Sequence, residues 1–524
     1  MESPRLSVLS LSLGTLLFSQ VAEAEKGLTV MDAVRAALEN HPNVVIGKQS
    51  LRANRGAIQS AQGAFDWSLS ANLGHVQSAN GGDINIGSQN FDITNQQDVT
   101  SMGAAVSKLL PWGMTISSGA DFSRSQIGQV VTATLGSSNE TDTTTPLIGT
   151  LFVNITQPLL QGLGSVTTAE LRAREAELLA AKDDYQQTIN NQLLEVVRAY
   201  WSYASSFAFL RAAREAEGRA RKLLEDNKKL VRADLRPAAE LRQLEANYAD
   251  VKQALYRSEQ ALVSARYTLG VAMGIDAKDA SALSHPSTKM PQPPEPEAIR
   301  ITNENIVQSA YKNRTDLLAL AKRVSAAKLR LELAENTKIP QLDLSARVQY
   351  AGAGADDDYR SSSIQNALTS QLGYTASLNL AFLWPPQMNA ADGLIAQQAA
   401  SLRIAQESQR ALRQQIGASV YSAIETLKQR ARIAYEAKKA ESYYKESVSN
   451  EEKKLKAGLS TLVSLVLTQE RLATAQSNAV AAMQAYADSI LSFRYATGAL
   501  LRRGKAFGQI SPAYLLEFPK ESKK

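Results

Sequence analysis

The chain has 524 residues, which is too long for one ordinary domain and allows two to four. It contains no cysteine, which excludes a disulfide scaffold, a thiol nucleophile and a cysteine-ligated metal. The formal net charge of +6 is evenly spread and too weak to indicate a nucleic-acid partner.

The first 24 residues have the pattern of a cleaved signal peptide. Arg5 precedes an apolar stretch over residues 6–18, and Ala22 and Ala24 place small residues before the expected cleavage point. A stretch of thirteen residues is too short to span a bilayer as a helix. No later run approaches eighteen apolar residues, so we expect the exported chain to enter a membrane only as a β-barrel.

After the signal peptide, hydrophobic periodicity changes from helical to strand-like. The sequence predicts a helix over residues 28–39, capped by Thr29, and a second over residues 43–64. From Trp67 the residues alternate between apolar and polar, as in a strand. The rest of this strand region, about 65–156, is predicted as two solvated loops over 78–98 and 136–145, a hairpin over 99–124, and a strand over 147–156 that ends at Pro158.

A long helical hairpin follows over residues 166–274. Residues 166–232 contain no proline and a single glycine, which predicts one helix roughly 100 Å long. Tyr200 and Trp201 are expected at an interface between helices. Pro237 marks the turn to a returning helix, and the proline-rich residues 276–302 are predicted as a linker.

The same plan returns over residues 303–500. Short helices are predicted over 303–311 and 316–338, and alternating strands within about 342–383 enclose a loop over 352–363 and stop at Pro385. A second long hairpin, 389–497, whose first helix is predicted over 389–456, precedes a basic tail over 501–524. Arg266-Tyr267-x-x-Gly270 recurs as Arg494-Tyr495-x-x-Gly498. We therefore predict two internal structural repeats, 25–275 and 303–500.

These elements together suggest a conduit. The predicted strands are too few for one chain to close a barrel, so several chains must share one, with lipid outside and water inside. The helical hairpins are too long for a compact globule. They leave no exposed edge only if they pack side by side into a closed cylinder.

With these elements in this order, the chain resembles the TolC family of outer-membrane efflux channels. The resemblance covers nearly all of residues 28–500, and the residues that carry it are Leu28-Thr-Val-x-x-Ala33-Val, Ala37-Leu-x-Asn40-x-Pro42, Gln157-Pro-Leu-Leu160, Pro340-Gln-Leu-x-Leu344, Gly458-Leu-Ser-Thr461 and Ala496-Thr-Gly498-x-Leu500. It implies an α+β membrane protein: a homotrimer with a twelve-stranded outer-membrane β-barrel, four strands per chain, continued by a long periplasmic α-helical barrel.

The resemblance also implies a function and a location. Such channels lie in the outer membrane of Gram-negative bacteria, in contact with its lipid, and extend into the periplasm. They are passive export ducts of tripartite efflux or type I secretion systems. A periplasmic adaptor and an inner-membrane pump or ABC exporter supply cargo and energy.

Site residues follow from the same resemblance. The helical tip turns, at Asp234, Leu235, Gly458, Leu459 and Ser460, are candidates for adaptor docking. The pore-entrance candidates are Glu240, Ser464 and Leu467. Pro158 and Pro385 mark the turns at the barrel end.

Three features depart from the family pattern. The hairpin over 99–124 is additional and puts the four-strand count in question. Thr315, in Arg314-Thr315-Asp316, replaces the usual proline. Ser464 and Leu467 stand where some members place acidic residues.

Two other function classes remain. A structural or adhesive coiled-coil envelope protein would explain the helices but not the alternating strands. An enzyme would need a nucleophile–base motif, metal-ligand spacing or a phosphate loop, and we find none in the sequence, so we expect no catalysis and no cofactor. The cargo is not readable. Trp67, Trp112 and Trp384 lie at strand ends, where barrels place interfacial aromatic residues but where ordinary packing also places tryptophan.

Overall fold

The computed structural model describes residues 27–87, 89–133, 138–144, 147–234, 238–299, 304–354, 361–370, 373–501 and 517–518. The predicted signal peptide and nearly all of the predicted tail lie outside these residues. The chain forms two compact units. The helical unit comprises Met1–Leu51, Ala181–Ala319 and Gln409–Lys524, and the sheet unit comprises Arg52–Ala180 and Leu320–Ser408. Within the described residues, none of the helices is long and apolar enough to cross a membrane.

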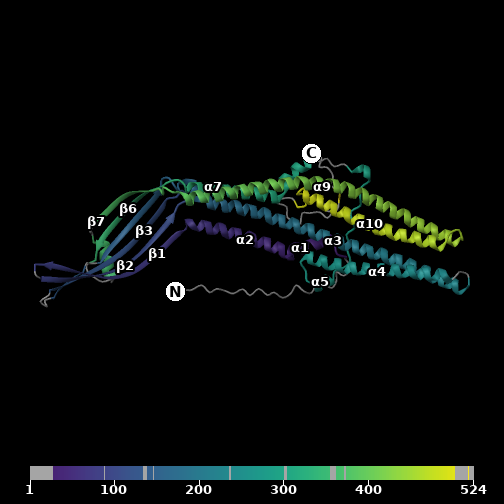
Figure 1. Ribbon diagram of the computed structural model, residues 1–524, viewed down its shortest axis with the longest axis horizontal. Helices are drawn as coiled ribbons and strands as arrows, with labels where there is room; N and C mark the ends of the chain where they lie inside the picture. Colours follow the sequence, from purple (N-terminus) through teal and green to yellow (C-terminus); the bar gives the residue numbers. More distant parts are fainter. Residues whose placement is uncertain are drawn as a thin grey trace, which may run out of the picture. The chain divides into compact units, whose positions relative to one another are not determined.

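The predicted helices occur in the predicted order (Figure 1), and two short helices, α5 and α8, are additional to them. The long helices α3 and α9 have 64 and 68 residues. Both lie within three residues of their predicted bounds, because alanine, leucine, glutamate and arginine sustain the helix without interruption. The bounds are α1 Val30–Asn40, α2 Pro42–Gln62, α3 Ala169–Arg232, α4 Ala238–Met273, α5 Ala277–Ser281, α6 Glu304–Asn313, α7 Thr315–Asn336, α8 Ser361–Thr369, α9 Asn389–Lys456 and α10 Leu462–Ala496.

Local chemistry fixes where the helices begin and end. Thr29 caps α1 as predicted: its side chain accepts from the Asp32 amide, and the Asp32 carboxylate accepts from the Thr29 amide. Gly274 and Gly498 follow α4 and α10 with φ of 71° and 66°. A Cβ at Gly274 would lie 2.6 Å from the Cα of His41, and one at Gly498 would lie 2.9 Å from a backbone carbon before α7. Each glycine thus lets a returning helix end tightly against the backbone of a shorter helix.

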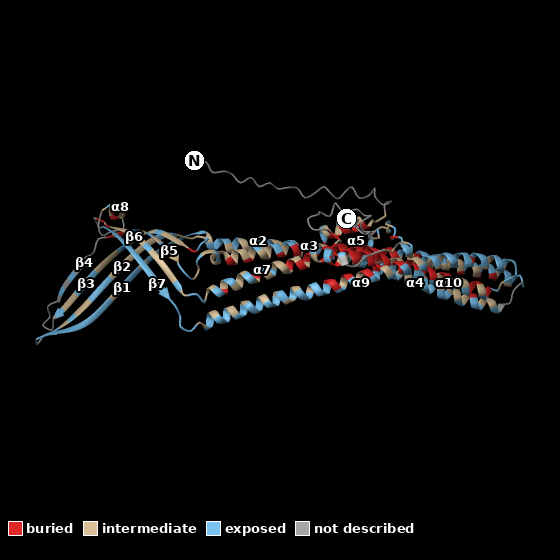
Figure 2. Cartoon of the chain, turned by 90° about the horizontal axis from the view of Figure 1, so that it is seen from above, coloured by how far each residue is buried: buried red, intermediate tan, exposed pale blue. Residues whose placement is uncertain are grey.

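The core of the helical unit contains large aromatic residues. Tyr200, Trp201 and Tyr203 on α3 are each at most 1% exposed and pack with residues from α1, α4 and α10. Tyr200 and Trp201 therefore lie at a helix interface, as predicted. Figure 2 shows the buried residues gathered in this unit, whereas the strands are mostly intermediate or exposed.

The proline-rich segment predicted as a linker is attached to the helical unit. Leu28 donates its amide to the carbonyl of His285, and Ser287 donates its amide to the carbonyl of Leu28, both at 2.9 Å. The hydroxyl of Tyr200 donates to the carbonyl of Leu28 and accepts from the amide of Thr288. This segment therefore helps to hold the start of α1 on the helical core.

The sheet is antiparallel throughout, with the order β1-β2-β3-β5-β6-β7 and β4 beside β3. The bounds are β1 Trp67–Ile86, β2 Gln89–Leu109, β3 Thr115–Ala133, β4 Ser138–Thr144, β5 Ile148–Pro158, β6 Gln341–Ala353 and β7 Gly373–Leu383. The first repeat region thus supplies four of the six strands along the main path. The structure corrects the four strands per chain that the family resemblance implies.

Two segments that the sequence predicts as loops form strands instead. Residues 78–98 belong to the hairpin of β1 and β2, which turns at Gly87 with φ of 68°. Residues 138–144, inside the second predicted loop, form β4 and pair with the distal half of β3. Both segments are rich in polar residues. The first has only a short apolar cluster on one face, Ile84, Ile86, Phe91 and Ile93, and not the sustained alternation that marks a half-buried strand. Helix α8 begins within the loop predicted over 352–363, and residues 355–360 of that loop lie outside the described residues.

Candidate functional site

The tip turn between α9 and α10 is a compact helix stop and start. The amide of Leu459 donates to the carbonyl of Lys454 at 2.9 Å, and Gly458 has φ of 74°. This left-handed glycine closes α9 as in a Schellman motif. The Ser460 hydroxyl donates to the carboxylate of Glu451, which ties the turn back to α9. Leu459 is 79% exposed and offers an apolar side chain at the tip.

Ser464 belongs to the first turn of α10. The Thr461 side chain caps this helix and accepts from the Ser464 amide at 3.2 Å. The hydroxyls of Thr461 and Ser464 lie 3.1 Å apart. Ser464 is half-buried, and both its amide and its hydroxyl lie against the cap residue Thr461.

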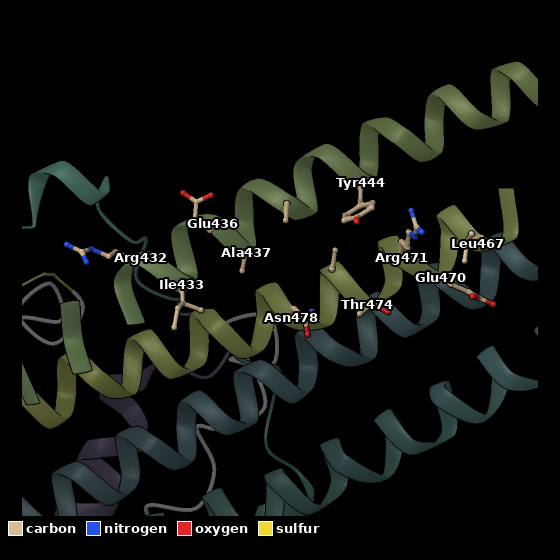
Figure 3. Close-up of a pocket in the computed structure, with 12 residues that line it drawn as sticks. Arg432, Ile433, Glu436, Ala437, Tyr444, Leu467, Glu470, Arg471, Thr474 and Asn478 are labelled. Carbon is tan, nitrogen blue, oxygen red and sulfur yellow. The ribbon is translucent and has the colours of Figure 1, made fainter. Parts of the chain in front are cut away.

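Leu467, one turn further, lines a groove of about 770 Å³ between α9 and α10. Figure 3 shows the lining residues, with Leu467, Glu470, Arg471 and Thr474 on α10 and Ile433, Glu436 and Tyr444 on α9. Apolar residues such as Ile433 and Ala437 line the groove together with charged ones such as Arg432. Ser464 is not among its lining residues, so the structure gives the two predicted entrance residues different surroundings.

The first tip turn uses a non-glycine residue. Asp234 is exposed and has φ of 59°, a left-handed conformation that aspartate tolerates better than most residues. Leu235 lies outside the described residues. Glu240 is half-buried in the first turn of α4, where the helix dipole favours a negative charge. The two tips pack through Leu224, Leu244, Leu462 and Val466, so α3, α4 and α10 share one small core there.

Thr315, the departure from the family pattern, begins α7 and is 2% exposed. Its hydroxyl donates to the side-chain oxygen of Gln187 on α3 at 2.9 Å. Beside it, Arg314 donates to the Asp316 carboxylate through two nitrogens and to the carbonyl of Tyr495. These bonds join α3, α7 and α10 through buried polar groups.

Sequence reasoning missed Asp488, an acid in the apolar stretch of α10. Burial raises its carboxyl pKa from 3.8 to about 6, and the Arg198 guanidinium on α3 acts against this rise. One carboxyl oxygen of Asp488 is buried with no hydrogen-bond partner among the described residues. The only sequence signal was a single acid between apolar residues, and that does not reveal what lies opposite.

The sheet has one apolar and one polar face, and the pairing register makes this explicit because directly opposed residues share a face. One row across the six strands is apolar except for one serine: Leu69, Val106, Ser118, Val153, Val348 and Ala376. The next row, on the opposite face, is entirely polar: Ser68, Ser107, Ser117, Asn154, Arg347 and Ser377.

The predicted strand-end residues lie together at one end of the strands. Pro158 is the last residue of β5, and Pro385 follows the end of β7 by two residues. Trp67 begins β1, Trp112 lies in the turn between β2 and β3, and Trp384 directly follows β7. All three tryptophans are at least half exposed. An exposed aromatic girdle at one rim is typical of outer-membrane barrels.

Among the described residues, no group of three or more histidine, aspartate or glutamate side chains could hold a metal ion.

Comparison with known proteins places the fold. No family model matches the sequence, and no curated protein matches it either. Among solved structures, the Campylobacter jejuni CmeC outer membrane channel has a TM-score of 0.63 at 12% identity over 96% of both chains. The outer membrane protein VceC from Vibrio cholerae has a TM-score of 0.60 at 16% identity over 90% of this chain and 96% of that one. The open Neisseria gonorrhoeae MtrE outer membrane channel has a TM-score of 0.58 at 13% identity over 90% of each chain.

These similarities span the sheet, the short helices and both long hairpins, since they cover at least nine-tenths of the chain. The chain therefore has the fold of outer-membrane channels of the TolC type, as its sequence resemblance predicts.

Proposed function

We propose that the chain is a passive outer-membrane export duct, a homotrimer that carries cargo from a periplasmic adaptor and an inner-membrane pump or ABC exporter to the exterior. The observation that carries the proposal is the two-faced sheet. Leu69, Val153 and Val348 lie on one face, and Ser68, Asn154 and Ser377 on the other. An apolar face suits lipid and a polar face suits a water-filled lumen.

The long hairpins fit the periplasmic part of such a duct. At 1.5 Å per residue, a helix the length of α9 extends roughly 100 Å. The exposed Leu459 at the tip turn is the surface that we assign to the adaptor.

The alternative is a structural or adhesive envelope protein built on the same helices. It gives no reason for a polar sheet face opposite an apolar one. Purified protein from outer-membrane fractions would be weighed in its native state and added to a planar lipid bilayer. We expect a trimer that conducts ions in discrete steps. A monomer, or a trimer that binds the bilayer without conductance, would favour the alternative.

A further inference from the structure

All six strands of the sheet path have the properties of barrel wall. Strands β4 and β5 occupy successive stretches of the same side of β3: β4 pairs with residues 126–132 and β5 with residues 115–123. Neighbouring strands alternate in direction, so β1 and β7, the end strands of the path, run antiparallel to each other. The apolar rows cross all six strands without changing face. A further apolar row is Ala71, Ala104, Ala120, Leu151, Tyr350 and Tyr374.

The two end strands are open to pairing. The rim half of β1, residues 67–74, and all of β7 contain no lysine, arginine, aspartate, glutamate or proline. Proteins that keep an edge strand solvated usually blunt it with charge or proline. Leu69, Leu73 and Leu378 are 77%, 80% and 73% exposed, so both end strands also present uncovered apolar side chains.

The strand ends at Trp67, Pro158 and Leu383 form one rim of the sheet, and they are staggered from strand to strand as in a barrel. A line across the hydrogen bonds from Trp67 at the start of β1 reaches β7 at Leu378. Strand β7 continues to Leu383, five residues further. The strand ends therefore step by about one residue per strand. With strands about 4.7 Å apart and a rise of about 3.3 Å per residue, this step corresponds to a tilt of roughly 35°, within the range of closed barrels.

From this geometry we propose that β7 of one copy pairs with β1 of a second copy, so that three copies close a barrel of roughly eighteen strands instead of twelve. The inference rests on the trimeric duct proposed above and deepens it. An even number of strands per chain keeps the closed sheet antiparallel. Such a barrel measures roughly 35 Å between opposite backbones, against roughly 24 Å for twelve strands.

The same geometry fixes the register of the seam. We count the shift as the number of residues by which β1 of the next copy is displaced along β7 from the line that joins Trp67 to Leu378. This shift must be even, because an odd shift would turn the apolar face of β1 toward the lumen. A shift of six residues aligns Leu73 of one copy with Leu378 of the next, and Trp67 with Trp384. A shift of eight would oppose Ser68 to Pro385, which has no amide hydrogen for the ladder. A shift of four would leave the end of β7 unpaired.

Disulfide trapping tests the seam, because the chain has no native cysteine. Directly opposed residues on antiparallel strands lie about 4.5–5.5 Å apart at Cα, within reach of a disulfide. We expect the Leu73→Cys/Leu378→Cys variant, oxidised in outer membranes, to migrate as a covalent trimer on a denaturing gel and to return to monomer on reduction. The matched control, Leu73→Cys/Phe382→Cys, places its cysteines about 13 Å apart in this register and should remain monomeric on the gel.

The Ala71→Cys/Leu380→Cys variant tests the same register and replaces the first variant if that one assembles poorly. A native, conducting trimer in which neither pair cross-links would overturn the six-strand wall and leave the duct intact. Cross-linking of the control pair in place of the matched pairs would overturn the register. A protein without cysteines that forms no trimer would overturn both this seam and the proposed function.

Discussion

The hydroxyl of Thr315 donates a 2.9 Å hydrogen bond to the side-chain oxygen of Gln187, and so joins the first residue of α7 to the middle of α3. Gln187 in turn donates through its side-chain nitrogen to Asn191 and to the hydroxyl of Tyr495. The residue that departs from the family pattern therefore has a structural function in this chain. A proline there would suit the first position of a helix but could not make this bond.

The first prediction removes that bond and keeps the shape of the side chain. Thr315→Val should lower the free energy of unfolding by about 1–3 kcal/mol, because the oxygen of Gln187 is left without its donor. Thr315→Ser keeps the hydroxyl and should stay close to the unsubstituted protein. Thermal unfolding of the detergent-solubilised protein, followed by intrinsic fluorescence, measures both. Equal loss in the two variants would mean that the methyl group, not the hydroxyl, is what matters.

The second prediction concerns the faces of the sheet. Leu344 lies opposite Leu380 on the apolar face, whereas its neighbour Ser345 lies opposite Asn379 and 3.1 Å from the hydroxyl of Thr156. Leu344→Arg should reduce the yield of assembled protein, because an arginine facing lipid is unfavourable, by about 2–4 kcal/mol at the midplane and by less toward a rim. Ser345→Arg should assemble and change the conductance instead. Equal assembly yields in outer-membrane fractions would show that the faces are assigned wrongly.

The sequence predicted best what depends on long, uninterrupted patterns. The 68 residues of α9 have the predicted bounds, since no proline breaks the run and a glycine ends it at Gly458. The strand pattern at Trp67–Leu73 was clear because one face is apolar. From Gln77 to Asp83 the same strand has mainly polar residues and glycine, and its pairing with β2 could not be recognised from hydrophobicity.

The candidate site divides in the same way. The tip turns were visible from Pro237 and Gly458, because both residues are local signals for the end of a helix. The surroundings of Asp488 and Thr315 depend on helices that are far apart in sequence, and periodicity within one helix does not say which residue faces which. The cross-strand register, and with it the number of wall strands, is likewise a long-range property.

The third prediction concerns the entrance. We expect weak cation selectivity and little block by trivalent cations, because Ser464 and Leu467 place no charge there. Ser464→Asp with Leu467→Asp should install both properties by forming a negative ring in the trimer. Aspartate at 464 also fits the first turn of α10, where it could accept from the Thr461 amide as Asp32 does at Thr29. The added charge should therefore not unfold the tip.

Single-channel reversal potential in a salt gradient, with and without a trivalent blocker, measures this effect. The neutral pair Ser464→Asn with Leu467→Asn is the matched control and should behave as the unsubstituted channel does. Strong selectivity and tight block before any substitution would mean that other acids line the entrance. Our assignment of Ser464 and Leu467 to it would then be wrong.

The last prediction is a pH dependence of stability that arises from Asp488. Its folded pKa of about 6 lies above the ordinary value of 3.8, because burial disfavours the carboxylate more than Arg198 favours it. Between these values the folded protein binds more protons than the unfolded chain, so stability falls as the pH rises from about 4 to about 6. The slope contributed by this group is at most about 1.4 kcal/mol per pH unit. Asp488→Asn, which cannot ionise, should remove that slope and be the more stable form at pH 7. Melting temperatures of both proteins from pH 4 to 8 test this, and parallel curves would mean that Asp488 is solvated in the assembled protein and does not titrate near pH 6.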